Sequence, residues 1–502
     1  MKKIIFIILL LIIGFIGAKF WQDSKNAEPA TVKDIVGADL PPATTSTEAE
    51  KLVTIPFYNR AEKDFKIKET YYVAINEPGA SNDNNGLYPT YQGGVNGPFK
   101  DLNSKDDRVR MLLQDKSEGV KLILRQGVYK LIPTQSTNDS GLVLRGSGDE
   151  FHPVIITSYY GETVILDGGE KLPTDQLKRV ASGKESYDIK IRQVIQLEGQ
   201  YNIVENLTIR DGFRHNIVAL GQYSIIRNNI LEGAYEDSVK NTVTSDYGIL
   251  LNNDISGFGS QGLDHFGADN WLIKGNNIHD PGIDPAGSVV AGNGIGAKGG
   301  NNNVVIIDNI IHDFDTQLDK GAIVLGGIAA AELYERNSRG QILPSVTHGI
   351  AIGNTIYNYR GPAVHFPSCH NCAFSENKIY NTVGAFRLGT NPEVRESSED
   401  VRVTPYTNGT VIKNNHFTGN DAKCTQENSV KLGMTCYVFY IETNEDARGL
   451  VSENNTYYTD TPPPFVYRYN GQIQKLDHKQ FIELLETDKT SRVSSRNRFI
   501  NN

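Results

Sequence analysis

The stretch LIKGNNIHD, residues 272–280, returns as VIIDNIIHD, residues 305–313. In both copies an apolar run is followed by asparagine, then by isoleucine and by a His-Asp pair. An asparagine followed closely by an apolar residue recurs along much of the chain. Its members are Asn206, Asn228, Asn253, Asn276, Asn309, Asn354, Asn377, Asn414 and Asn454.

The four shortest intervals between these asparagines are 22 to 25 residues. Short β-rich runs repeated at such a period predict an all-β fold, a parallel β-solenoid with three short strands in each rung. The L-x-x-L-x-L frame of a leucine-rich repeat is absent. Stacked asparagines can chain their amide hydrogen bonds from rung to rung and tolerate the left-handed backbone of a tight turn. We therefore expect them to be structural.

A second strand can be aligned upstream of the asparagine in each rung. One of its columns is apolar throughout and is expected to point inward, because side chains of a strand alternate between its faces. It comprises Ile217, Val239, Leu263, Ile295, Ala322, Ala363 and Ala385. The same parity predicts an outward apolar stripe, which the N-terminal segment or the loops 327–347 and 390–407 should cover. The stripe comprises Ile323, Leu325, Val364, Phe366, Phe386 and Leu388.

The N-terminus has the residue pattern of a targeting signal. Lys2 and Lys3 precede an uncharged run of fifteen residues, which suits a signal-peptide core and is short for the ~20 residues of a membrane-spanning helix. Residues 1–21 are predicted to be a signal peptide or an uncleaved membrane anchor, and residues 22–69 a flexible tether rich in Pro, Thr, Ala and acid. We expect an exported protein.

Charge and cysteine content limit the partners. The net charge of −9, with no long basic run, argues against nucleic acid. Four cysteines in an exported chain predict two local disulfides, Cys369–Cys372 and Cys424–Cys436, in preference to a zinc site. We expect a monomer.

Several segments resemble a known group of proteins. They are YYVAINEPGASNDNNG (71–86), ITSYYGETVILDGG (156–169), GIGAKGGNNNVVIIDNIIHD (294–313), CHNCAFSENKIYN (369–381) and the tail KLDHKQFIELLETDKTS (475–491). Over roughly residues 70–500 they look like the right-handed parallel β-helix proteins of the pectate lyase-like superfamily, which include many polysaccharide lyases. The resemblance implies a single-stranded β-helix over residues 70–470 and a helical tail, residues 471–502, packing on it. It specifies fold more than activity.

Three neighbouring rungs turn charged residues outward at Lys240, Asp264 and Lys298. Lyases of uronic-acid polymers neutralise a sugar carboxylate and remove the adjacent proton. The sequence thus predicts β-elimination on an acidic polysaccharide, with Lys298 as base. The candidate catalytic residues are Lys298, Lys240, His265 and Arg387, and the candidate substrate-binding residues are Asn241, Phe266 and His365. The candidate ligands of a predicted Ca²⁺ are Asp237, Asp264 and Glu236.

Alternatives stay open at this level. Lys240, Asp264 and Lys298 could form a cross-rung salt bridge without catalytic use. His265, His365 and Arg387 share the inward parity, so a bulge is needed for any of them to reach substrate. A C5-epimerase would use the same proton abstraction. A non-catalytic glycan-binding or envelope scaffold protein would account for the fold equally well.

Overall fold

The computed structural model describes residues 46–53, 62–103, 108–115, 119–132, 140–169, 192–282, 292–314, 320–327, 344–389, 394–395, 402–403, 407–418, 437–442, 445–458, 465–469, 472–485 and 492–494. All of them belong to one compact unit, Ala43–Asn502. The predicted signal or anchor, residues 1–21, and the predicted Cys424–Cys436 disulfide lie outside the described residues. Within the described part of the chain, no helix has the length and apolar character needed to cross a membrane.

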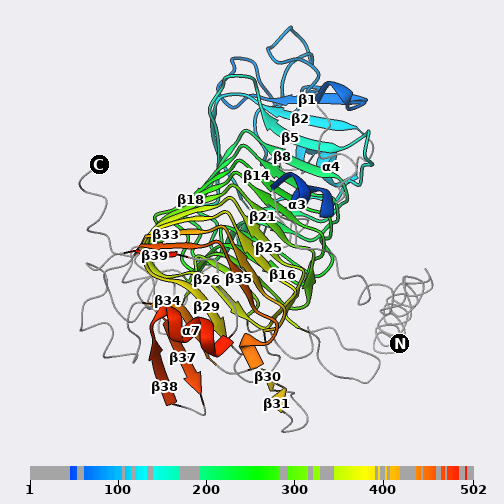
Figure 1. The fold of residues 1–502 in the computed structure, drawn as a ribbon. Helices are drawn as coiled ribbons and strands as arrows, with labels where there is room; N and C mark the ends of the chain where they lie inside the picture. The colour runs from blue at the N-terminus through cyan, green and yellow to red at the C-terminus, as the bar shows by residue number, and fades with distance from the viewer. Residues whose placement is uncertain are drawn as a thin grey trace, which may run out of the picture. The chain divides into compact units, whose positions relative to one another are not determined.

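The strands form a parallel β-helix with three faces, as the repeat predicted (Figure 1). A typical rung runs from β10 (His215–Ala219) on the second face to β11 (Ile225–Arg227) on the first and β12 (Ile230–Glu232) on the third. Each of these strands pairs in parallel with its counterpart in the next rung. Stacked rungs bury a continuous apolar core that runs along the solenoid.

The strands of the three faces follow the chain in order. The first face contains β1 (Glu69–Val73), β2 (Val120–Leu124), β5 (Val154–Ser158), β8 (Asn202–Glu205), β11, β14 (Ile249–Leu251), β17 (Leu272–Lys274), β21 (Val305–Ile307), β25 (Ile350–Ile352), β28 (Ala373–Ser375), β32 (Val411–Lys413) and β35 (Val451–Glu453). The second face contains β4 (Ser140–Leu144), β7 (Gln193–Leu197), β10, β13 (Val239–Asn241), β16 (Gln261–Phe266), β19 (Asn293–Lys298), β23 (Ile323–Leu325), the later parts of β26 (Thr355–Pro367) and β29 (Lys378–Gly389), β34 (Tyr437–Ile441) and β37 (Phe465–Tyr469). The third face contains β3 (Gly127–Lys130), β6 (Val164–Asp167), β9 (Thr208–Arg210), β12, β15 (Asp254–Ser256), β18 (Asn277–His279), β22 (Ile310–Phe314), the earlier parts of β26 and β29, β33 (His416–Thr418), β36 (Thr456–Tyr458) and β39 (Arg492–Ser494).

A few elements lie outside the three faces. They are the helices α3 (Ser46–Leu52), α4 (Arg108–Asp115) and α7 (His478–Leu485), the 3-10 turns η1 (Glu62–Asp64) and η4 (Glu445–Ala447), and the strands β20 (Asn301–Asn302), β24 (Val346–Thr347), β27 (Cys369–His370), β30 (Val394–Arg395), β31 (Arg402–Val403) and β38 (Gln472–Leu476). The helix α7 is the predicted C-terminal helix, and its buried Phe481 packs against the rings of Phe439 and Phe465. The predicted disulfide between Cys369 and Cys372 is formed.

A ladder of buried asparagines runs between the first and third faces, and in each pair the Nδ2 of one member donates to the Oδ1 of the next. Its members are Asn229, Asn253, Asn276, Asn309, Asn354, Asn377, Asn415 and Asn455. The sequence alignment had mixed two adjacent positions. Asn206, Asn228, Asn414 and Asn454 precede the ladder position and adopt a positive φ of 55° to 59°. Asparagine serves both positions because it tolerates the left-handed region and carries an amide.

The register of the second face differs from the aligned one beyond β19. Ile295 pairs with Ile323, and Ile323 pairs with Val364, one residue later than predicted in each rung. The expected outward apolar stripe, which also holds Leu325, Phe366, Phe386 and Leu388, is therefore wholly buried in the core. It needs no cover. The alignment had placed the alanines at 322, 363 and 385 in the inward column. Alanine does not identify the inward side of a strand, because a small apolar residue can be buried on either side.

An apolar column does face outward on the first face. It includes Ile249, Leu272 and Val305, and it packs with Ala49 and Val53 of the N-terminal segment. Lys274 forms an ion pair with Glu50 of α3 at the same place. Part of the segment predicted to be a flexible tether is therefore docked on the solenoid.

Candidate functional site

One column of outward-facing residues follows the second face along the solenoid. Its members are Cα partners in successive rungs: Val143, Gln196, Val218, Lys240, Asp264, Gly296, Val324, His365, Arg387, Tyr440 and Val466. We call it the outward column. Because neighbouring rungs lie ~4.8 Å apart, side chains of adjacent members can touch.

Two lysine ammonium groups converge on the buried carboxylate of Asp264. Lys240 Nζ lies 2.6 Å from its Oδ2, and Lys298 Nζ lies 2.9 Å from its Oδ1. Asp264 is 3% exposed, whereas the lysine side chains are 29% and 23% exposed. Burial opposes the charge of Asp264, but the two ammonium groups outweigh it and hold the pKa of this carboxyl below its usual value. The surface thus presents two ammonium groups, which we call the lysine pair, anchored from beneath by one anion.

A second buried carboxyl group, Asp237, lies beside the lysine pair. Its Oδ2 is 3.7 Å from Lys240 Nζ and 3.7 Å from His215 Nδ1. Its Oδ1 has no hydrogen-bond partner among the residues that the structure describes. Burial, reinforced by the charge of Asp264, raises the pKa of Asp237 to about 7. This group can therefore accept and release a proton near neutral pH.

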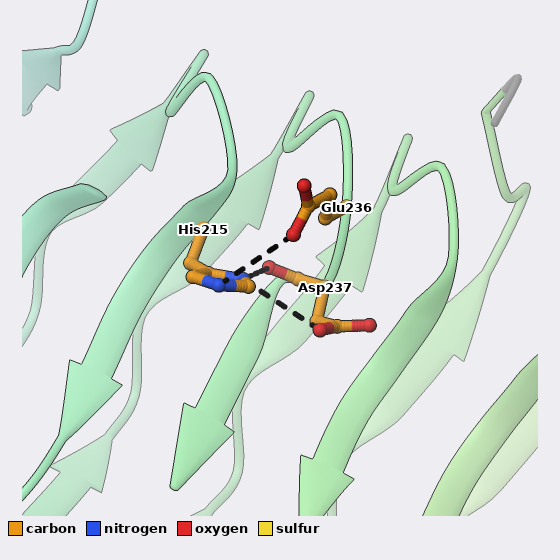
Figure 2. A group of neighbouring side chains, drawn as sticks. All are labelled: His215, Glu236 and Asp237. Atoms are coloured by element: carbon orange, nitrogen blue, oxygen red, sulfur yellow. Dashed lines mark hydrogen bonds and ion pairs between the residues drawn. The ribbon is translucent and has the colours of Figure 1, made fainter. Parts of the chain in front are cut away.

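His215 and Glu236 complete the cluster. Figure 2 shows the imidazole of His215 directed at Glu236 and Asp237 of the next rung, with Nε2 3.8 Å from Glu236 Oε2. Arg214 Nε lies 2.9 Å from both carboxylate oxygens of Glu236. Burial, together with the charges of Lys240 and Arg214, lowers the pKa of His215 to about 3, so the imidazole is neutral.

Sequence reasoning missed His215 and Arg214. Their positions in the strands could have indicated that they lie close together. His215 precedes the inward Ile217 by two residues, as Asp237 precedes the inward Val239 in the next rung. Residues at the start of equivalent strands stack at one corner of the solenoid, and the alignment had followed only the strand centres.

Two predicted site residues lie in the core instead. His265 is fully buried on the inward side, 2.5 Å from Asn241 through Nδ1 and Nδ2, and its ring packs against Trp271. Burial lowers the pKa of His265 to about 3. The predictions that His265 is catalytic and that Asn241 binds substrate are corrected, because both side chains point away from the surface. Phe266 is half-buried and is the Cα partner of Lys298, so it remains a candidate for substrate contact.

His365 and Arg387 face outward, contrary to the predicted parity, because of the register shift beyond β19. Arg387 is nevertheless four rungs from Asp264, ~19 Å along the solenoid, and its guanidinium pairs with Glu442 at 2.5 Å. Burial, with the charge of Arg387, lowers the pKa of His365 well below its usual value, so this imidazole is neutral. Neither residue joins the lysine pair.

A cation could be held by His215, Glu236 and Asp237, whose ligand atoms lie within 4.8 Å of one another. Asp264 is engaged by the lysine pair and is not among them. Ca²⁺ takes six to eight oxygen ligands, so it would need oxygens beyond those of Glu236 and Asp237. Lys240 and Arg214 already bring positive charge to these two carboxylates. The Ca²⁺ predicted from the sequence stays a prediction.

Comparisons with known proteins found distant similarity among solved structures. No family model matches the chain, and no curated protein matches it. Among solved structures, XylC in complex with xylose is 12% identical, with 85% of this chain and 86% of that chain covered and a TM-score of 0.46. The A-module of the mannuronan C-5 epimerase AlgE4 from Azotobacter vinelandii is 12% identical, with 78% and 97% covered and a TM-score of 0.43. The pectate lyase Pel9A is 13% identical, with 80% and 79% covered and a TM-score of 0.37.

Proposed function

We propose that the protein cleaves an acidic polysaccharide by β-elimination at the lysine pair and Asp237. The observation that carries the proposal is the convergence of two partly exposed ammonium groups on one buried carboxylate, next to a second buried carboxyl group. It combines the two requirements of the reaction, a positive surface for a sugar carboxylate and a group that moves a proton.

The lysine pair supplies the first requirement. Asp264 neutralises only one of the two charges and holds both ammonium groups at the surface. A sugar carboxylate that contacts Lys240 and Lys298 would lose much of its negative charge, and the proton on the adjacent carbon would become more acidic. This role for Lys298 replaces that of base, because its ammonium group is engaged by Asp264 at 2.9 Å.

Asp237 supplies the second requirement. A β-elimination takes a proton from the sugar ring and gives one to the departing glycosidic oxygen. A single group with a pKa near neutrality can do both in turn, and the pKa of Asp237 is raised to about 7 by burial and by Asp264. The neutral His215, 3.7 Å from Asp237, would limit its movement.

The test is an assay of unsaturated product with a panel of homopolymeric and mixed acidic polysaccharides, followed by ultraviolet absorbance. Asp237→Asn should lower kcat by ~10² to 10⁴ with little change in KM. Asp254→Asn, on the third face, is the matched control, because it removes a half-exposed carboxylate far from the outward column. Wild-type activity in Asp237→Asn would refute the assigned role.

Other products would point to the alternatives. Solvent deuterium at C5 without chain cleavage would indicate a C5-epimerase, and new reducing ends without unsaturation would indicate hydrolysis. Tight binding with no reaction would indicate a glycan-binding or envelope scaffold protein. Assays with and without chelator test the predicted Ca²⁺. Export, an N-terminal membrane tether and the monomeric state remain predictions, to be tested by cell fractionation and light scattering.

A further inference from the structure

Positive charge is distributed unevenly about the lysine pair. Toward the N-terminal rungs, the outward column presents only the neutral side chains of Val218, Gln196 and Val143. Beside them, Arg145 pairs with Glu198 at 2.6 Å and Arg214 pairs with Glu236 at 2.9 Å. We call this side of the lysine pair, where the column members are Val218, Gln196 and Val143, the neutral flank.

On the opposite side the outward column continues with Gly296, Val324 and the neutral His365, and two lysines belong to these rungs. Lys298 belongs to β19, one rung beyond Asp264. Lys320 precedes β23 in the following rung, and its charge acts on His365. A polysaccharide lying along the outward column would thus meet an ammonium group on either side of Asp264, and neutral members of the column beyond Lys240.

The lack of charged members in the outward column on the neutral flank limits where acidic sugars can bind. One sugar unit of an extended chain is about as long as the ~4.8 Å spacing of rungs, so a sugar next to the one at the lysine pair would lie over Val218. A carboxylate placed there would lose water without gaining a counter-charge, which is unfavourable. A neutral sugar carries only hydroxyl groups and apolar ring faces, which suit Val218 and the half-buried Leu220.

We propose that the substrate is a heteropolysaccharide in which the acidic sugar bound at the lysine pair is joined to neutral sugars over the neutral flank. The inference rests on the proposed function and adds the class of substrate. An uninterrupted polyuronate would place an acidic sugar over Val218 in every binding register. A mixed polymer can avoid this contact.

The experiment compares homopolyuronates with the same polymers after partial reduction of their carboxyl groups to neutral sugars. Alginate, polygalacturonate and polyglucuronate are each assayed intact and reduced, together with natural polymers of alternating acidic and neutral sugars. The full-length protein should show a kcat/KM per remaining acidic sugar that is at least about tenfold higher with mixed polymers, equivalent to ~1.4 kcal/mol.

A charge introduced on the neutral flank gives a second arm. Val218→Lys places an ammonium group one rung from Lys240 and should cut the preference for mixed polymers by about tenfold, ~1.4 kcal/mol. Val218→Met adds similar bulk without charge and should keep the preference. Thermal unfolding of both variants shows whether either is damaged, and the wild-type comparison stands without them.

The outcomes separate the inference from the proposed function. If intact homopolyuronates are the best substrates, the inference is overturned while the lyase stands. If no polymer yields unsaturated product, the proposed function fails and the inference with it. A Val218→Lys variant that folds and leaves the preference unchanged also contradicts the inference.

Discussion

Replacing Asp264 by asparagine removes one buried charge and leaves the shape of the side chain. In the native structure that charge faces Lys240 Nζ at 2.6 Å and Lys298 Nζ at 2.9 Å. Breaking a buried ion pair by removing one partner costs ~3 to 5 kcal/mol. Both lysine side chains are about a quarter exposed and can turn toward water, so we expect a smaller loss of ~2 to 3 kcal/mol for Asp264→Asn.

Urea unfolding at neutral pH measures this loss. Lys298→Met leaves Asp264 its contact with Lys240 and should cost only ~1 kcal/mol. Asp254→Asn controls for removal of a half-exposed carboxylate, one that pairs with His279, and should cost no more than ~1 kcal/mol. A loss of under ~0.5 kcal/mol in Asp264→Asn would refute the view that this anion anchors the lysine pair.

The same variant has a second, independent readout. Burial is the main cause of the raised pKa of Asp237, and the negative charge of Asp264 adds to it. Asp264→Asn should therefore lower the pKa of Asp237 and move the midpoint of the pH–rate profile to more acidic values. A midpoint that stays in place would separate Asp237 from the proton transfer.

Three further predictions concern single residues. The pKa of Asp237 is higher in the folded than in the unfolded protein, so the free energy of unfolding should fall as pH rises from about 4 toward 7. Asp237→Asn should therefore unfold at a higher temperature than wild type at pH 8. Equal Tm values would contradict this. Burial lowers the pKa of His279, but hydrogen bonds to Asp280 and Asp254 outweigh burial and raise it. The charged imidazole should therefore stabilise the fold fully below pH ~6.5, and this contribution should be lost as pH rises through the raised pKa of the folded state. His279→Gln should abolish this pH dependence of the urea midpoint. Asn309→Ala should cost ~2 to 4 kcal/mol in urea unfolding, because the ladder amides on both sides lose buried partners, and a loss below ~1 kcal/mol would argue against the ladder.

The repeat could be predicted from the sequence, but the site could be predicted only in part. A repeated asparagine followed by apolar residues was enough to predict parallel rungs, since only stacked turns bring such residues together at one phase. The same pattern placed Lys240, Asp264 and Lys298 on the outward side of three neighbouring rungs, because no bulge intervenes between their strands. Beyond β19 the register moved by one residue, and one residue is enough to exchange the two faces of a strand.

The amino-acid sequence by itself determined the architecture, the asparagine ladder in outline and the outward direction of Lys240, Asp264 and Lys298, since these follow from local periodicity and turn chemistry. Only the tertiary structure decided that His265 is a core residue, that His365 faces outward, and that Asp237 and His215 meet beside the lysine pair. The reason is physical. Burial sets the charge state of each group, and the distance between rungs sets which groups it can contact. Both depend on the strand register, which the sequence pattern does not specify where small apolar residues occupy the strand.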